Sequence, residues 1–208
     1  MREMKYSDRL VKLQPYLFAE IDKAKRQAKA RGRDIVDLGI GDPDLPTPPH
    51  IVEALYKAAL DINNHHYALD SGMPEFRRAI AKWYRGRFNV KLDPDTEILP
   101  LIGSKEGIAH FPLAFVNTGD YVLVPDPCYP PYRNGTIFAG GVPYLMPLLP
   151  ENDFLPDLSR IEKSALKKAK LMFINYPNNP TGAVANEEFY RRTLAFARNN
   201  NVFICSDA

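Results

Sequence analysis

Short apolar runs alternate with helix-forming segments in the second half of the chain, and this alternation restricts the fold more than any other feature. Strands that alternate with helices indicate an α/β architecture with a largely parallel sheet. In such a sheet ligands bind at the carboxyl ends of the strands, so function should be sought in the residues after each strand. Five runs have the length and composition of buried strands: residues 98–102, 121–124, 142–146, 171–174 and 202–205. A helix is predicted after the first, second and fourth of these runs, the last one over residues 186–199.

The first hundred residues carry helical rather than strand patterns. Apolar residues recur at helical spacing from about residue 10 to residue 30, which predicts one N-terminal helix. A pair of prolines, tolerated in a first helical turn, favours a second helix that continues over residues 51–60. A third helix is predicted over residues 74–88, and residues 35–38 form a short extended piece.

Composition narrows the classes of function. The chain has 208 residues, of which 45% are hydrophobic and 25% charged, as is typical of a globular domain. Its formal net charge of +2 favours neither a nucleic-acid surface nor an acidic tail, so we expect small-molecule partners rather than nucleic acid. Cys128 and Cys205 lie far apart and outside any C-x-x-C spacing, so neither a disulfide framework nor a metal site is indicated. No apolar run has the length of a membrane span, and together these features predict a cytoplasmic protein.

The loop after the first run contains Gly103, Ser104 and Lys105 and leads into a helix. Small residues at a helix start expose backbone N–H groups beside the positive end of the helix dipole, which suits a phosphate group. Lys105 adds a positive charge. A helix cap made by Ser104 is the alternative interpretation.

Two further loops carry a rigid aromatic ring and a rigid amide. Prolines flank Tyr129, so its ring can present a fixed flat face to a planar ligand, or it can simply pack under the loop. In the stretch YPNNPTG, Asn178 and Asn179 lie between two prolines at the end of a strand. An amide fixed in this way can donate a hydrogen bond to a ligand oxygen. Simple tolerance of a turn conformation is the alternative, and it explains Asn178 better than Asn179.

The last run is followed by Asp207. A carboxylate at the end of a buried strand is costly without a partner, so Asp207 indicates a cation or a protonated ring nitrogen nearby, with a helix cap as the alternative. A phosphate site, an aromatic face, an amide donor and a carboxylate together suit pyridoxal 5'-phosphate. The pyridinium nitrogen of that cofactor pairs with an acidic group.

The chain resembles a known family through five motifs: LGIGDPDLPTPP, IGSKEGIAHFPLAF, VPDPCYPPY, INYPNNPTGA and CSDA. They follow the order of the fold-type I, class I/II pyridoxal-phosphate aminotransferases, and the similarity extends over essentially the whole chain. Within this family, QPYLFAEI followed by LGIGDPD and GSKEG is most similar to the enzymes that act on LL-diaminopimelate. The resemblance implies the large domain of a pyridoxal-phosphate-dependent transferase, with three α/β/α layers around a mostly parallel sheet.

The resemblance also implies cofactor roles for the residues at the strand ends. Ser104 and Lys105 would bind the cofactor phosphate. Tyr129 would stack on the pyridine ring, and Asn179 would contact its 3-hydroxyl oxygen. Asp207 would keep the ring nitrogen protonated, which lets the ring accept electrons during the reaction.

Four other residues match family positions that concern the substrate or the dimer. Tyr67 matches the tyrosine that reaches the phosphate of the neighbouring subunit, which implies a homodimer. Tyr16 and Gly41 match positions beside the substrate. Asp70 falls where an acidic residue reaches across the dimer toward the distal ammonium of the substrate.

The lysine that binds the cofactor covalently in this family lies on a later strand. The resemblance therefore places it beyond Ala208 and assigns no catalytic residue to this chain. Residues 1–45 would form an N-terminal arm and the start of the small domain, and residues 46–208 the N-terminal part of the large cofactor-binding domain. The sheet would then be truncated before its last strands, and we expect the chain alone to be an N-terminal portion, poorly stable and inactive.

The activity implied by the resemblance is that of an aminotransferase. It would move an amino group between LL-2,6-diaminopimelate and a 2-oxo acid, 2-oxoglutarate, through pyridoxal phosphate, in lysine biosynthesis. An aspartate, alanine or aromatic aminotransferase, or a C–S lyase of the same fold, is the second interpretation. A catalytically inactive relative that binds the cofactor is the third.

Overall fold

The computed structural model describes residues 5–13, 17–37, 39, 41, 43–67 and 71–208. The chain divides into two compact units. One unit combines Met1–Gln14 with Leu101–Ala208, and the other is Pro15–Pro100. In the described part of the chain, no helix has both the length and the apolar character needed to cross a bilayer.

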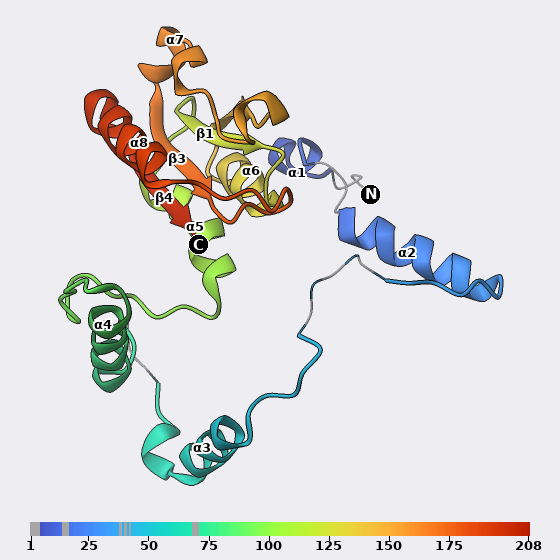
Figure 1. Ribbon diagram of the computed structural model, residues 1–208, viewed down its shortest axis with the longest axis vertical. Coiled ribbons are helices and arrows are strands. Elements are labelled where there is room, and N and C mark those ends of the chain that lie inside the picture. Colours follow the sequence, from blue (N-terminus) through green and yellow to red (C-terminus); the bar gives the residue numbers. More distant parts are fainter. Residues whose placement is uncertain (1–4, 14–16, 38, 40, 42, 68–70) are drawn as a thin grey trace. The chain divides into compact units, whose positions relative to one another are not determined.

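The first unit is built on a parallel sheet of four strands (Figure 1). The strand order is β2-β1-β3-β4, and each neighbouring pair runs parallel. β1 and β3 are therefore central, and their side chains on both faces are covered. The strands are β1 (Tyr121–Asp126), β2 (Val142–Pro147), β3 (Ala169–Asn175) and β4 (Phe203–Asp207).

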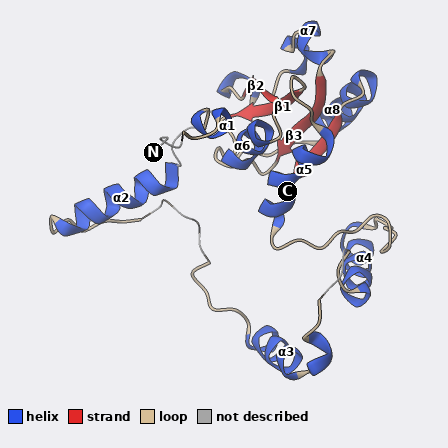
Figure 2. Ribbon diagram, turned by 180° about the vertical axis from the view of Figure 1, so that it is seen from behind, coloured by secondary structure: helices blue, strands red, loops and turns tan. Residues whose placement is uncertain are grey.

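Alternate residues of the central strands enter two separate hydrophobic clusters, one on each face of the sheet. On one face, Val122 and Phe173 pack with residues of α5 (Ser104–Phe115) and α6 (Pro130–Phe138). On the other face, Leu123 packs with residues that include those of α7 (Lys163–Leu166) and α8 (Glu187–Asn200). The three-layer α/β/α arrangement predicted from the sequence is confirmed, and Figure 2 shows the sheet between these helices.

Local signals in the sequence explain where several helices begin and end. α6 opens with two prolines in its first turn, where a missing N–H costs nothing. The side chain of Asn186 caps α8 by accepting a hydrogen bond from the N–H of Phe189 at 2.9 Å. Asn201 ends the same helix in the left-handed conformation, at φ 53°. The shorter elements of this unit are α1 (Asp8–Val11), η2 (Pro150–Asn152) and η3 (Leu158–Arg160).

The second unit consists of helices joined by loops. The predicted second and third helices are confirmed as α3 and α4, and each has a proline in its first turn. The elements are α2 (Leu17–Ala30), α3 (Pro49–Leu60), η1 (Ile62–Asn64) and α4 (Pro74–Phe88).

Two predictions about secondary structure are wrong. The single helix over residues 10–30 is divided, because α1 ends at Val11 and α2 begins at Leu17. Pro15 has no N–H to donate to the carbonyl of Val11, so a continuous helix would lose a hydrogen bond there. The strand over residues 98–102 does not form, because no described strand pairs with it. A strand needs a hydrogen-bonded neighbour, which an apolar run by itself does not supply.

Outside these two elements the sequence placed the strands and helices of the sheet correctly, within a few residues. The division into an arm over residues 1–45 and a cofactor domain over residues 46–208 stays a prediction.

The contact between α5 and α6 depends on Gly135. A Cβ at this position would lie 2.8 Å from the carbonyl oxygen of Ala109 and 3.3 Å from its Cα. Backbone atoms cannot move aside as a flexible side chain can. Glycine at residue 135 therefore sets how closely the two helices approach.

Replacing Gly135 with alanine should lower the free energy of unfolding by ~1–3 kcal/mol, because the added methyl group overpacks this contact. Gly86→Ala is the matched control. Gly86 also lies inside a helix, α4, but a Cβ there meets nothing within 4 Å. Its better helix propensity should stabilise the protein by up to about 1 kcal/mol. Urea unfolding measures the change in the free energy of unfolding for both variants. A Gly135→Ala variant as stable as the wild type would contradict the close contact between α5 and α6.

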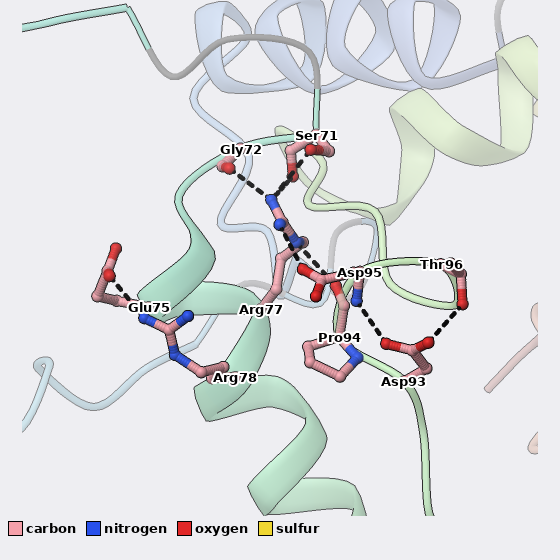
Figure 3. Close-up of polar contacts among 9 residues, drawn as sticks. All are labelled: Ser71, Gly72, Glu75, Arg77, Arg78, Asp93, Pro94, Asp95 and Thr96. Carbon is pink, nitrogen blue, oxygen red and sulfur yellow. Dashed lines mark hydrogen bonds and ion pairs between the residues drawn. The ribbon is translucent and has the colours of Figure 1, made fainter.

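Arg77 is a buried cation that joins two loops to α4 (Figure 3). Its side chain is 8% exposed. Its Nη1 donates to the carbonyl oxygens of Ser71 at 3.1 Å and Gly72 at 2.7 Å. Its Nε donates to the carbonyl oxygen of Pro94 at 2.8 Å, and its Nη2 pairs with Asp95 at 3.0 Å. The planar guanidinium thus fixes the loop before α4 to the loop after it.

Arg77→Lys should destabilise this unit by ~1–3 kcal/mol, since a lysine ammonium cannot reach both loops and leaves carbonyl groups unpaired. Arg78→Lys is the control. Arg78 is 59% exposed, and in the part of the chain that the structure describes it pairs with Glu75 one turn away. Its replacement should change stability by less than about 0.5 kcal/mol. Hydrogen exchange of the α4 amides reports both effects, and equal exchange in the two variants would refute the joining role of Arg77.

Candidate cofactor site

The carboxyl ends of the parallel strands bring three predicted site residues to one edge of the sheet. Tyr129 follows β1, Asn179 follows β3, and Asp207 is the last residue of β4. The first turn of α5 lies beside the end of β4 in both views (Figures 1 and 2). The structure therefore places these residues, together with Ser104 of α5, on the same side of the first unit.

Asp207 is fixed at two points. Its carboxylate oxygen Oδ2 accepts a hydrogen bond from the hydroxyl of Tyr132 at 2.7 Å. Its backbone carbonyl oxygen accepts a hydrogen bond from Nδ2 of Asn175 at 2.6 Å. Asp207 is the last residue of β4, and its alternative role as a helix cap stays a prediction. The partner observed here is a neutral phenol rather than the cation that a buried carboxylate suggests.

Tyr132 is completely buried in α6. Its ring stacks on Phe173 with 4.7 Å between ring centroids and 12° between ring planes. Its edge meets the ring of Tyr129 with 5.8 Å between centroids. Burial, and then the neighbouring Asp207 carboxylate, raise the pKa of Tyr132 far above its usual value, so the phenol remains a hydrogen-bond donor.

The asparagine turn after β3 is held by its own side chains. Oδ1 of Asn178 accepts hydrogen bonds from the backbone N–H of Thr181 at 3.2 Å and from its hydroxyl at 2.8 Å. Asn178 is 4% exposed, and it therefore forms the turn rather than a ligand contact. The backbone N–H of Asn179 donates to Oδ1 of Asn175 at 2.6 Å, while the Asn179 side chain is exposed. An exposed amide on a fixed backbone is suited to a ligand oxygen.

The start of α5 has the geometry expected of a phosphate site. Gly103 precedes the helix with φ 79°, a conformation that favours glycine, and Ser104 is the first helical residue. The cap alternative for Ser104 is wrong, because no side chain caps this helix at residue 103. Instead the carboxylate of Glu106 accepts from the N–H of Ile102 at 2.7 Å. Ser104 and Lys105 are both exposed in the first turn.

The structure does not test the other four predicted residues. Tyr67 lies in the second unit and is 95% exposed. Gly41 is in the same unit, and a Cβ there would meet nothing within 4 Å. Tyr16 and Asp70 lie outside the described residues. The roles of all four stay predictions.

The donor set at the strand ends fits pyridoxal phosphate. It combines an aromatic ring, an exposed amide, a carboxylate and a helix start, which are the groups that a phosphorylated pyridinium requires. In the described part of the chain, no three His, Cys, Asp or Glu side chains are placed to hold a metal ion.

The comparison with known families agrees with this geometry. A model of the family described as aminotransferase class I and II matches residues 33–208. The chain belongs to this family. Its members depend on pyridoxal phosphate.

Several individual proteins are similar to the chain. An LL-diaminopimelate aminotransferase of Aquifex aeolicus is 58% identical over 202 residues, which are 97% of this chain and 52% of that protein. One from Oleidesulfovibrio alaskensis is 54% identical over 100% of this chain and 54% of its own length. The chain thus spans about half the length of the curated relatives it matches.

Solved structures share the fold. BacF from Bacillus subtilis superposes with a TM-score of 0.91 and 41% identity, over 99% of this chain and 52% of that one. A probable N-succinyldiaminopimelate aminotransferase from Thermus thermophilus gives a TM-score of 0.86 and 40% identity, over 92% of this chain and 52% of that one. These similarities confirm the fold-type I, α/β prediction.

Sequence reasoning missed two residues of the site, Tyr132 and Asn175. Tyr132 is part of the motif CYPPY and follows Tyr129 by three residues at the start of a helix, a spacing that brings side chains together. Asn175 is the last residue of β3, and a polar residue that ends a buried strand is the signal that could have revealed it.

Two half-buried cysteines lie close in sequence to the residues of this site: Cys128 precedes Tyr129, and Cys205 lies two residues before Asp207. Both are free and half-buried, and both pack against the cluster that contains Tyr132. Burial raises the pKa of Cys128 and of Cys205 to about 11 in each case.

Alkylation by iodoacetamide should therefore be slow in the folded protein. At pH 8.5 the thiolate fraction should be about 100-fold below that of an ordinary cysteine, and the rate should rise until pH 11 or so. Because the unfolded thiols ionise near pH 9, the folded state should also lose stability as the pH rises from 9.0 to about 11. Protein unfolded in guanidinium is the control, and equal rates in the folded and unfolded states would contradict the burial.

Proposed function

We propose that the chain is the N-terminal half of an aminotransferase that moves an amino group between LL-2,6-diaminopimelate and 2-oxoglutarate. The similarity to LL-diaminopimelate aminotransferases, 58% identity over 97% of the chain in one relative, is the observation that carries this proposal. The cofactor site at the strand ends supports it. We also propose that the full-length protein is a cytoplasmic homodimer, on the basis of Tyr67 and the two free cysteines.

Pyridoxal phosphate would supply a protonated ring that accepts electrons when a bond to the substrate α-carbon breaks. Asp207 would hold the proton on the ring nitrogen, because a carboxylate favours a neighbouring cation. Asp207 thus acts electrostatically and does not shuttle protons.

The other residues of the site would bind and orient the cofactor. The first turn of α5, with Ser104 and Lys105, would bind the phosphate through N–H groups and positive charge. Tyr129 would cover one face of the ring and exclude water from it. Asn179 would donate a hydrogen bond from its amide to the 3-hydroxyl oxygen.

A panel of amino donors tests the proposal on the full-length protein with 2-oxoglutarate as the acceptor. We expect glutamate to form fastest from LL-diaminopimelate, with kcat/KM at least about 10-fold above aspartate, alanine and phenylalanine, because only a diamino acid presents a second ammonium group. Asp207→Asn is the control for cofactor chemistry and should lower kcat by about 10²–10³-fold.

Other outcomes of the panel decide among the alternatives. A preference for aspartate, alanine or phenylalanine would replace the substrate assignment while leaving the aminotransferase intact. Release of pyruvate and ammonia from cystathionine would indicate a C–S lyase. Cofactor binding without any turnover would indicate a catalytically inactive relative.

A further inference from the structure

The hydroxyl of Tyr132 is the side-chain donor that contacts the Asp207 carboxylate. The bond runs from α6 to the end of β4 and joins residues 75 positions apart in the sequence. It uses one carboxylate oxygen, Oδ2, at 2.7 Å. Among the described residues, the other oxygen has no recorded hydrogen-bond partner.

The Tyr132 ring has little freedom to move. It is completely buried, it stacks on Phe173 of β3, and its edge contacts Tyr129. Pro131, next to it in the first turn of α6, is also buried and fixes the backbone there. A ring held on these sides directs its hydroxyl at one point, the carboxylate of Asp207.

A phenol is a suitable partner for a carboxylate that must bind a cation. It donates one hydrogen bond without bringing a positive charge, so the carboxylate keeps its full negative charge for a ligand. An arginine or a lysine at the same place would neutralise that charge. Because burial raises the pKa of Tyr132, the hydroxyl keeps its proton at neutral pH.

The backbone of Asp207 is fixed separately. Asn175 donates to the Asp207 carbonyl oxygen at 2.6 Å and accepts from the N–H of Asn179 at the same distance. Asn175 therefore fixes where the strand ends and sets the position of the asparagine turn. Tyr132 fixes how the carboxylate is turned, which Asn175 does not determine.

We propose that Tyr132 is a positioning residue of the cofactor site: its hydroxyl fixes one oxygen of Asp207, so that the other is presented to the protonated ring nitrogen of pyridoxal phosphate. The inference rests on the proposed function and names a residue through which the Asp207 site is preorganised. Preorganised charge is effective because it does not have to reorient when the ligand binds.

The test uses Tyr132→Phe in the full-length protein, loaded with pyridoxal phosphate labelled with ¹⁵N in the ring. The variant removes only the hydroxyl, so the ring still packs on Phe173. We expect the ¹⁵N signal of the ring nitrogen to move toward that of the unprotonated form. We also expect the dissociation constant for the cofactor to rise roughly 10-fold, as follows from the loss of a hydrogen bond to a charged group.

Tyr176→Phe is the matched control. Tyr176 is also buried, and its hydroxyl donates to the backbone carbonyl of Phe154 at 2.9 Å rather than to Asp207. Both variants lose one buried hydrogen bond, so both should lower the unfolding midpoint in urea. Only Tyr132→Phe should shift the ¹⁵N signal, and the control should bind the cofactor within about 2-fold of the wild type.

The outcomes separate the two proposals. If the wild-type protein binds no pyridoxal phosphate, the proposed function fails, and this inference fails with it. If Tyr132→Phe binds the cofactor with an unchanged ¹⁵N signal, or if both variants shift that signal equally, only the role of Tyr132 is overturned.

A second measurement tests the role of Tyr132 if the Tyr132→Phe variant does not fold. In a crystal structure of the loaded wild-type protein, we expect the Tyr132 hydroxyl to remain within hydrogen-bond distance of one Asp207 oxygen while the other contacts the ring nitrogen. Both oxygens turned away from Tyr132 would overturn the role.

Discussion

The parallel pairing of β1, β3 and β4 is the constraint on which the rest of the candidate site depends. Parallel strands end at the same edge of a sheet, so residues that lie far apart in the sequence become neighbours there. The register pairs Asn175 with Asp207 across β3 and β4. This pairing brings the side chain of Asn175 within reach of the Asp207 carbonyl oxygen and places the asparagine turn beside the carboxylate.

The buried amide side chains at this edge are hydrogen-bonded. Asn175 and Asn178 are buried side chains, and both are hydrogen-bonded within the turn or to Asp207. An unpaired amide or hydroxyl in the same place would cost a large share of the stability of a domain. Among the residues proposed to meet the ligand, Ser104, Lys105 and Asn179 are exposed, and Tyr129 and Asp207 are half-buried. The fully buried side chains thus build the frame, and the more exposed ones remain available to a cofactor.

The sequence predicted the elements that carry strong local signals. A pair of prolines located the start of α3, and apolar runs located β1 to β4 because buried parallel strands are apolar on both faces. The run over residues 98–102 has the same composition, yet it forms no strand because it lacks a paired neighbour. In the first unit, Tyr129, Asn179 and Asp207 were predicted because each follows a strand. Tyr132 was not, because its role comes from a contact across 75 positions of sequence.

The sequence by itself determined the family, the α/β class and the residue types available at each strand end, since motifs and periodicity are local properties of the chain. Only the tertiary structure decided which of those residues meet. It gave Asp207 a neutral phenol as its partner and placed Asn175 between two strand ends. These outcomes depend on strand register and on the packing of α6 against the sheet, and neither is encoded in any short stretch of residues.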